Sequence, residues 1–252
     1  MKKILILLLL SPIFALGNPI DYNCSKNVIW GAPILQEGNN QYLCRTDYAV
    51  NYSYKNKTPF YVVEHITQDH IKLIIDRKNN FHEDLDIIPK YRSTLKDYFN
   101  TGYDKGHLAP AGDFTYNKDV MSQSFLLSNM IPQNKNNNRV IWNHLEQNIR
   151  RLVNRSGSLY VITGTIYSKE YKTIGNNVGV PNEIYKIIID DNKNRMIAFK
   201  FPNISIDPKL VANYIVSVKS IEDITGIDFF PNIPTDLKYL EFDIVEYKDW
   251  FL

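Results

Sequence analysis

The stretch from Tyr103 to Pro110 places an acid, a cation, a glycine and an imidazole side by side. Asp104, Lys105 and His107 are its chemically capable members. Hydrolysis of a phosphodiester needs a base that takes a proton from water, and the unperturbed pKa of histidine, ~6.5, suits that task near neutral pH. It also needs positive charge near the transition state, which Lys105 could supply. A single histidine beside charged residues is more often structural, so this interpretation needs a second element.

A second set of residues lies on a helix that we expect from the residue pattern. Asn138, Trp142, Glu146 and Arg150 follow one another at steps of four, which places them along one slowly turning helical face. An amide oxygen at a helix N-terminus can bind Mg²⁺, which prefers oxygen ligands and keeps several waters, and Glu146 could hold one of those waters. The ordinary alternative is an Asn cap, a core Trp and a surface Glu146–Arg150 pair worth only ~0.3 kcal/mol.

Taken together, the two sets follow the order strand, histidine-bearing turn, strand, loop and helix. This order resembles the DNA/RNA non-specific endonucleases of the endonuclease G type, whose signature is Asp-Arg-Gly-His with Ala-Pro, then Ser-Asn-Met/Ile-x-Pro-Gln, then Asn, Trp and Leu-Glu. The resemblance extends from residue 48 to the segment 225–230. The residues that match in order are Asp104, Gly106, His107, Ala109, Pro110, Ser128, Asn129, Pro132, Gln133, Asn138, Trp142, Leu145 and Glu146.

The resemblance implies the central roles in catalysis. His107 is similar to the family's general base. Asn138 is similar to the single protein ligand of one Mg²⁺, for which another divalent ion such as Mn²⁺ could substitute. Glu146 is similar to the residue that holds a metal-bound water.

Supporting roles follow from the same resemblance. Arg77 is similar to an upstream arginine that contacts the phosphate, although a solvated surface charge is the alternative. Asn129 is expected to support the site, and Asp104 to orient the histidine-bearing turn. Lys105 stands where the family has arginine, so the charge is kept but the two-pronged fork is not.

For the whole protein, the resemblance implies an endonuclease that cuts DNA and RNA with little sequence preference and leaves 5′-phosphate ends. It also allows a homodimer. Two other classes remain open, namely a catalytically silent nucleic-acid-binding envelope protein of the same fold and a zinc hydrolase. The zinc alternative is weakened because no histidine pair has the helical two-His spacing with an intervening Glu. The histidines are His65, His70, His82, His107 and His144.

The first residues have the layout of a secretory signal peptide. Lys2 and Lys3 precede the apolar run Ile4–Leu10, and small residues stand at positions 15 and 17. The run is shorter than the ~20 residues that cross a bilayer. We therefore expect residues 1–17 to be a signal peptide, residues 18–252 to be one domain without membrane contact, and the protein to be secreted or periplasmic. An uncleaved anchor is the alternative.

Charge and cysteine content add two expectations. The chain has 29 Lys and Arg against 27 Asp and Glu, and loss of Lys2 and Lys3 would leave the two equal. Any phosphate-binding surface must therefore be local, because the overall field is weak. Cys24 and Cys44 are the only cysteines, and in an oxidising compartment they would pair and contribute ~3 kcal/mol. Two free buried thiols are the alternative.

Apolar patterning predicts a mixed fold without regular alternation, which argues for the α+β class. Strands are predicted over 47–54, 59–66, 124–127, 158–167, 184–189 and 195–201. Residues 67–102 are expected to be mostly loop, with a short helix within 93–99. Ile141, Leu145, Ile149 and Leu152 predict a helix capped by Asn138, and 220–225 predicts one that ends at Gly226. The resemblance adds the ββα-metal (His-Me finger) endonuclease fold, with a central, mainly antiparallel sheet flanked by helices.

Overall fold

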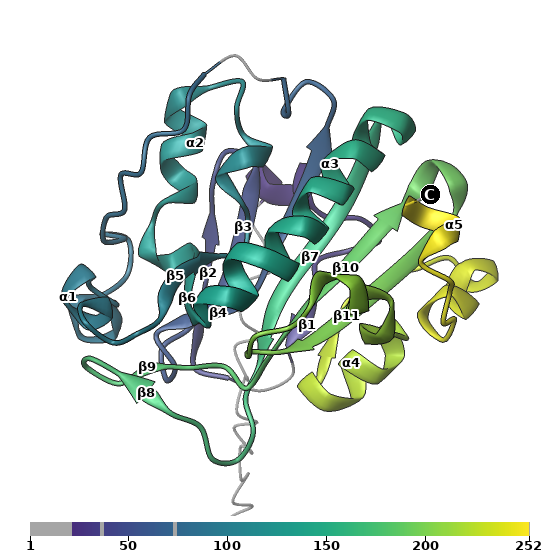
Figure 1. Ribbon diagram of the computed structural model, residues 1–252. Coiled ribbons are helices and arrows are strands. Elements are labelled where there is room, and N and C mark those ends of the chain that lie inside the picture. Colours follow the sequence, from purple (N-terminus) through teal and green to yellow (C-terminus); the bar gives the residue numbers. More distant parts are fainter. Residues whose placement is uncertain (1–21, 36–37, 73–74, 252) are drawn as a thin grey trace, which may run out of the picture.

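A computed structural model describes residues 22–35, 38–72 and 75–251. The expected signal peptide, residues 1–17, lies outside these ranges. A seven-stranded sheet forms the centre, and helix α3 (Asn143–Ser156) crosses it (Figure 1). All neighbouring strands in the sheet are antiparallel. Their order is β12 (Ile215–Val216), β11 (Arg195–Pro202), β10 (Glu183–Asp190), β7 (Ser158–Ile166), β4 (Thr58–Thr67), β3 (Tyr48–Ser53) and β2 (Asn40–Cys44).

Both faces of the sheet are buried. Successive side chains of a strand point to opposite faces, so each strand contributes to two cores. On β4, Val62 and Ile66 join the core beneath α3, whereas Tyr61 and Val63 join the core on the other face. Helix α4 (Val218–Thr225) packs in that second core and ends at Gly226, whose φ of 68° is the left-handed conformation that stops a helix. The five predicted strands of this sheet, the short helix and the α+β class are therefore confirmed.

A two-stranded finger stands beside α3. Strand β5 (Asp104–His107) pairs antiparallel with β6 (Met130–Gln133), which sets His107 opposite Met130. The connection between them holds η3 (Ala111–Asp113), α2 (Lys118–Ser124) and η4 (Leu127–Asn129). The strand predicted over 124–127 is wrong. The Asn117 side chain caps α2, so the chain is helical as far as Ser124 and extends only from Met130.

The predicted helix begins earlier than expected. Asn134, not Asn138, caps it: its side-chain oxygen accepts from the backbone N–H groups of Asn136 and Asn137 at 3.0 and 3.1 Å. Residues Asn137–Trp142 then form a π-helical turn, η5, before the regular α3. Because a π turn holds more residues than an α turn, it shifts the faces on which the following side chains point.

The remaining elements surround the sheet. Segment 67–102 is mostly loop, as predicted, with a short helix, α1, inside the expected range. Cys24 and Cys44 are joined in a disulfide, with Cα atoms 5.7 Å apart, which confirms the predicted pairing. Within the described ranges, no helix is long and apolar enough to span a membrane. These elements are η1 (Tyr22–Asn27), β1 (Ile34–Leu35), η2 (Pro89–Tyr91), α1 (Leu95–Tyr98), β8 (Thr173–Ile174), β9 (Val178–Gly179), η6 (Asp191–Lys193), η7 (Pro208–Tyr214), β13 (Ile227–Asp228), η8 (Thr235–Glu241) and α5 (Lys248–Phe251).

Candidate active site

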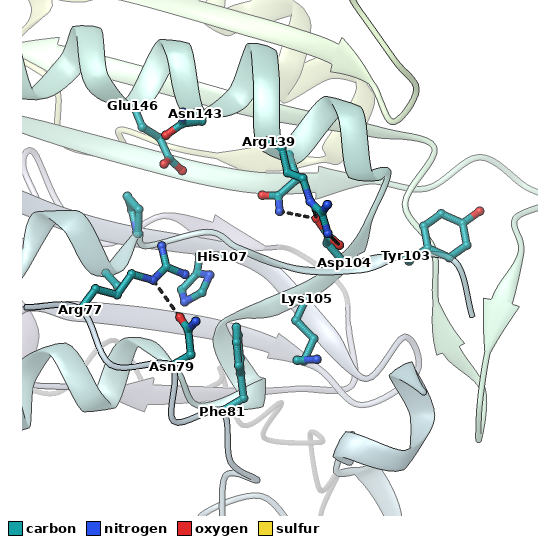
Figure 2. A pocket seen from close by; sticks show the side chains of 13 residues that line it. Arg77, Asn79, Phe81, Tyr103, Asp104, Lys105, His107, Arg139, Asn143 and Glu146 are labelled. Carbon is teal, nitrogen blue, oxygen red and sulfur yellow. Dashed lines mark hydrogen bonds and ion pairs between the residues drawn. The ribbon is translucent and has the colours of Figure 1, made fainter. Parts of the chain in front are cut away.

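A cavity of about 530 Å³ lies between the finger, the start of the long helix and the segment that follows residue 75. Figure 2 shows His107 and Arg77 on one side of it and Glu146 on the other. Six of the residues predicted from sequence line this one cavity: Arg77, Asp104, Lys105, His107, Asn138 and Glu146. The seventh, Asn129, lies behind the histidine.

His107 forms part of the cavity wall with little exposure to water. Only 8% of the residue is exposed, and the rings of Phe81 and Phe125 lie 5.4 and 4.9 Å from its own. Burial, helped by the charge of Arg77, lowers the pKa of His107 to about 3. Its Nε2 finds no hydrogen-bond partner in the part of the chain that the structure describes. The ring is thus neutral at physiological pH, and the orphaned nitrogen suits a water or substrate partner.

Asn129 fixes the backbone immediately after His107. Its side-chain NH₂ donates to the carbonyl oxygens of Ala109 and Ser124, both at 2.8 Å, and its side-chain oxygen accepts from the Ala109 N–H at 2.9 Å. Its backbone oxygen also accepts from the Leu108 N–H at 3.1 Å. One buried amide thereby holds the histidine-bearing segment from two sides. This is the task that we had expected of Asp104.

Asp104 instead serves the helix on the other side of the cavity. Its carboxylate accepts a hydrogen bond from Asn138 Nδ2 at 3.0 Å and two from Arg139 at 2.8 Å. Although partial burial acts the other way, these donors hold the pKa of Asp104 below its ordinary value. Within the described residues, the amide oxygen of Asn138 accepts no hydrogen bond. The amide is therefore oriented with its oxygen free at the cavity wall.

Glu146 reaches the cavity from the first turn of α3 (Figure 2). Burial raises the pKa of its carboxyl, and the positive charges of Lys186 and Arg150 oppose that rise. Arg150 is itself paired with the buried Asp113 at 2.7 Å. The positive charges of Lys186 and Arg150 thus favour the charged form of the Glu146 carboxylate, an acceptor that can hold a water.

Arg77 contributes a cation from the opposite wall. Its Nε donates to the Asn79 side chain at 2.9 Å, and its guanidinium carbon lies 5.3 Å from the centre of the Phe125 ring. No carboxylate pairs with it among the described residues, so its remaining donors are free to bind an anion.

Lys105 lines the same cavity but leans toward aromatic rings. Its ammonium lies 4.9 Å from the centre of the Phe81 ring and 5.8 Å from that of Tyr98. Such contacts attract a cation to the ring face. The charge is therefore kept close to the cavity, at a place set by Phe81 rather than by an acid.

Five further residues line the cavity that the sequence did not single out: Asn79, Phe81, Ala111, Arg139 and Asn143. Conversely, Trp142 does not face it. The Trp142 ring is 1% exposed and packs against the ammonium of Lys186 at 4.9 Å. The π turn explains the exchange of Trp142 for Asn143, because it brings Asn143 rather than Trp142 onto the face of Asn138. The residue pattern alone gave no indication of this turn.

The donor set suits a hard cation better than zinc. The free amide oxygen of Asn138 and the carboxylate of Glu146 are oxygen donors, as Mg²⁺ prefers. In the described ranges, no group of three or more His, Cys, Asp or Glu side chains could hold a metal ion. The histidines have other neighbours: His65 stacks on Tyr160 and His70 on Tyr116. A zinc site of the usual protein-rich type has no counterpart there.

Comparison with known proteins decides the family. Residues 31–236 match the DNA/RNA non-specific endonucleases. Nuclease C1 from Cunninghamella echinulata var. echinulata is 36% identical over 79% of this chain and 88% of its own length. The chain belongs to this family. It is accordingly an enzyme, a phosphodiester hydrolase of the non-specific endonuclease class.

Other nucleases are also similar in sequence to this endonuclease. The mitochondrial nuclease of Saccharomyces cerevisiae is 34% identical over 77% of the chain and 67% of its own length. The human mitochondrial nuclease EXOG is 32% identical over 75% of the chain, which spans 57% of that protein. A crystal structure of an EndoG/EndoGI complex matches with a TM-score of 0.73 at 31% identity, over 80% of this chain and 89% of that one. The ββα-metal fold class is therefore confirmed.

The relatives also correct one expectation. We predicted a secreted or periplasmic endonuclease from the N-terminal residues. Several of the relatives are named mitochondrial nucleases, including those of human, yeast and Xenopus laevis. This contradicts the predicted location, which depended on the residues before position 22 alone.

Proposed function

We propose that this endonuclease cleaves DNA and RNA in a Mg²⁺-dependent reaction, with little sequence preference, and leaves 5′-phosphate and 3′-hydroxyl ends. The observation that carries the proposal is the meeting of His107 and Asn138 on the walls of one cavity, with Glu146 beside them. Low sequence preference is expected because the cavity offers cations and amides that suit the phosphate backbone, and backbone contacts do not specify bases.

In the proposed reaction His107 acts first. Its neutral ring accepts a proton from a water, whose oxygen attacks phosphorus while the bond from phosphorus to the 3′ oxygen breaks. The leaving 3′ oxygen takes up a proton from solvent. Arg77 and Lys105 offset the charge that grows on the phosphoryl oxygens.

The other wall would hold the metal ion. Asn138 would supply the one direct protein ligand, through the amide oxygen that Asp104 leaves free, and Glu146 would hold a water of the ion's shell. When bound, Mg²⁺ would act as a Lewis acid on the phosphoryl oxygen and stabilise the leaving oxygen. Because no carboxylate would bind the ion directly, we expect modest metal affinity.

A plasmid-nicking assay tests the proposal. The parent is expected to nick and linearise plasmid DNA and to degrade RNA with Mg²⁺, and to do neither with a chelator present. His107→Ala should lose activity by roughly 100-fold or more, as general-base variants do. End-labelling of the products would identify the 5′-phosphate. A His107→Ala variant that cuts as fast as the parent would remove His107 from the mechanism.

The silent-protein alternative predicts a different result. Binding of nucleic acid without metal-dependent cleavage would support it. The presence of His107, Asn138 and Glu146 around one cavity argues for catalysis instead.

A further inference from the structure

A second cavity, of about 330 Å³, lies beside the C-terminal half of α3. Among the described residues, its wall consists of two arginines, two amides and one aromatic ring, without an acidic side chain: Asn148, Arg151, Asn154, Arg155 and Phe251. Phe251 belongs to α5, and the Arg155 guanidinium donates to the Trp250 carbonyl at 3.0 Å. We refer to this feature as the α3–α5 cavity.

The two arginines of this cavity differ from most arginines of the molecule, because they pair with no carboxylate among the described residues. The chain has eight arginines, all within the described ranges. Five of them pair with carboxylates, namely Arg45, Arg92, Arg139, Arg150 and Arg195. Of the three that do not, Arg77 lines the cavity that holds His107 and Glu146, which we refer to as the catalytic cavity. Arg151 and Arg155 line the α3–α5 cavity.

Both arginines keep donors for a ligand. Arg151 donates to the Asn148 side-chain oxygen, and Arg155 to the Trp250 carbonyl. Each guanidinium has five N–H donors, so most remain available, and its planar fork fits phosphate oxygens in pairs. Both residues are exposed to solvent. Since the net charge of the chain is only +2, attraction of a polyanion must come from such local sites.

The position of the cavity relates it to the catalytic one. Figure 1 shows β5 and β6 on one side of α3 and α5 on the other. Asn143 lines the catalytic cavity and Asn154 lines the α3–α5 cavity, and both residues are exposed. They are eleven positions apart on α3, close to three full turns, so they lie on one face of the helix with a rise of roughly 16 Å between them. Base pairs of a duplex that lies along this face rise by about 3.4 Å each, so the separation corresponds to about five base pairs. Such a duplex can contact both cavities at once.

We propose that the α3–α5 cavity binds a backbone phosphate of the substrate several nucleotides from the cleaved bond. The inference rests on the proposed function, since it assigns a second contact to the same nucleic acid. Arg151 and Arg155 hold the phosphate, and the exposed amide of Asn154 adds a polar contact. Phe251 offers an apolar surface to the adjoining sugar.

The test measures binding to a labelled duplex and to a labelled trinucleotide in chelator, over a range of salt concentrations. The variant carries Arg151→Gln and Arg155→Gln. On a duplex of two helical turns, it should bind roughly tenfold more weakly than the parent at low salt. The slope of log affinity against log salt should fall by about 1, the loss of one phosphate contact. On a trinucleotide, which is too short to reach from the catalytic cavity, parent and variant should bind alike.

The matched control removes two charges from the opposite face of the sheet, through Lys219→Gln and Lys238→Gln on α4 and η8. Its salt slope should equal that of the parent. Arg151→Lys with Arg155→Lys keeps the charge but not the fork, and should keep the slope with weaker affinity. This pair of lysine substitutions also provides the comparison if the glutamine variant does not fold.

Several outcomes would overturn the inference. An unchanged slope on the duplex would do so, because no phosphate contact would then have been lost. An equal loss of affinity on the trinucleotide would also do so, because the effect would then arise inside the catalytic cavity. Inorganic phosphate that binds to the parent but not to the glutamine variant, while both bind the duplex alike, would assign the cavity to free phosphate. If the glutamine variant bound nucleic acid like the parent but bound anionic phospholipid vesicles more weakly, the cavity would be assigned to a membrane surface. Failure of the proposed function is distinguishable, because the parent itself would then not cleave the duplex with Mg²⁺.

Discussion

Asp104 accepts a hydrogen bond from Nδ2 of Asn138 across 3.0 Å, and this contact determines which end of the Asn138 amide meets the cavity. The two residues come from different elements, β5 and the π turn, 34 positions apart. Arg139 holds the same carboxylate with two hydrogen bonds of 2.8 Å. The acid of the histidine motif is thus a positioning residue for the amide of the helix.

Replacement of Asp104 by Asn should weaken metal binding. The neutral amide holds Arg139 and Asn138 less firmly, so the Asn138 oxygen would face the cavity for only part of the time. Residues that orient a metal ligand typically change metal affinity or activity 10–100-fold. We expect the Mg²⁺ concentration for half-maximal cleavage to rise roughly tenfold. Asp236→Asn, which removes an exposed acid on η8, is the matched control and should leave that concentration unchanged.

His107 should stay neutral well below pH 6. Its pKa is lowered to about 3 in the folded chain and is ~6.5 when unfolded, so the unfolded chain binds an extra proton between these values. Stability is therefore lost as pH falls below about 6.5, by about 2 kcal/mol at pH 5, and His107→Gln should lack this component. NMR titration of the ring and urea unfolding at several pH values measure it. A folded-state ring that titrates near pH 6.5 would contradict the assignment.

Asn129→Ala should destabilise the fold as well as the site. The substitution leaves the N–H and carbonyl of Ala109 and the carbonyl of Ser124 without their buried partner. Unpaired buried groups cost ~1–3 kcal/mol each, so the loss of three partners should lower the free energy of unfolding by about 3 kcal/mol or more. Gln147→Ala, on the exposed face of α3, should change it by less than about 0.5 kcal/mol. Equal stability of the two variants in urea would show that Asn129 does not clamp this segment.

Substitutions of Lys105 distinguish the contribution of its charge from that of its packing against Phe81. Lys105→Met keeps the contact with Phe81 but removes the charge, and should lower kcat/KM for plasmid DNA by roughly 100-fold, the loss typical of a transition-state donor. Lys105→Arg keeps the charge, adds the fork and should retain at least the rate of the parent. If Lys105→Met cleaves as fast as the parent, the ammonium only covers the aromatic rings and takes no part in catalysis.

Much of the architecture followed from local patterns. Strands β3, β4, β7, β10 and β11 were predicted because their β-branched and aromatic residues suit a buried sheet. Gly226 stopped α4 as expected, since a glycine tolerates the left-handed conformation there. The strand predicted over 124–127 failed because the Asn117 cap outweighed a short apolar run.

By itself, the sequence determined which groups could carry the chemistry. The order of His107, Asn129, Asn138 and Glu146 along the chain predicted one finger and one helix, and these lie around one cavity. Residue type and spacing fix which side chains each element carries, and the family resemblance supplied the roles expected of them.

Only the tertiary structure decided how those groups are oriented. Asp104 is paired across the cavity rather than within its own turn, and the π turn exchanges Asn143 for Trp142 on the catalytic face. Asn134 rather than Asn138 caps the helix, which leaves the Asn138 oxygen free. Such outcomes depend on competition among hydrogen-bond partners distant in sequence, which a local pattern does not contain.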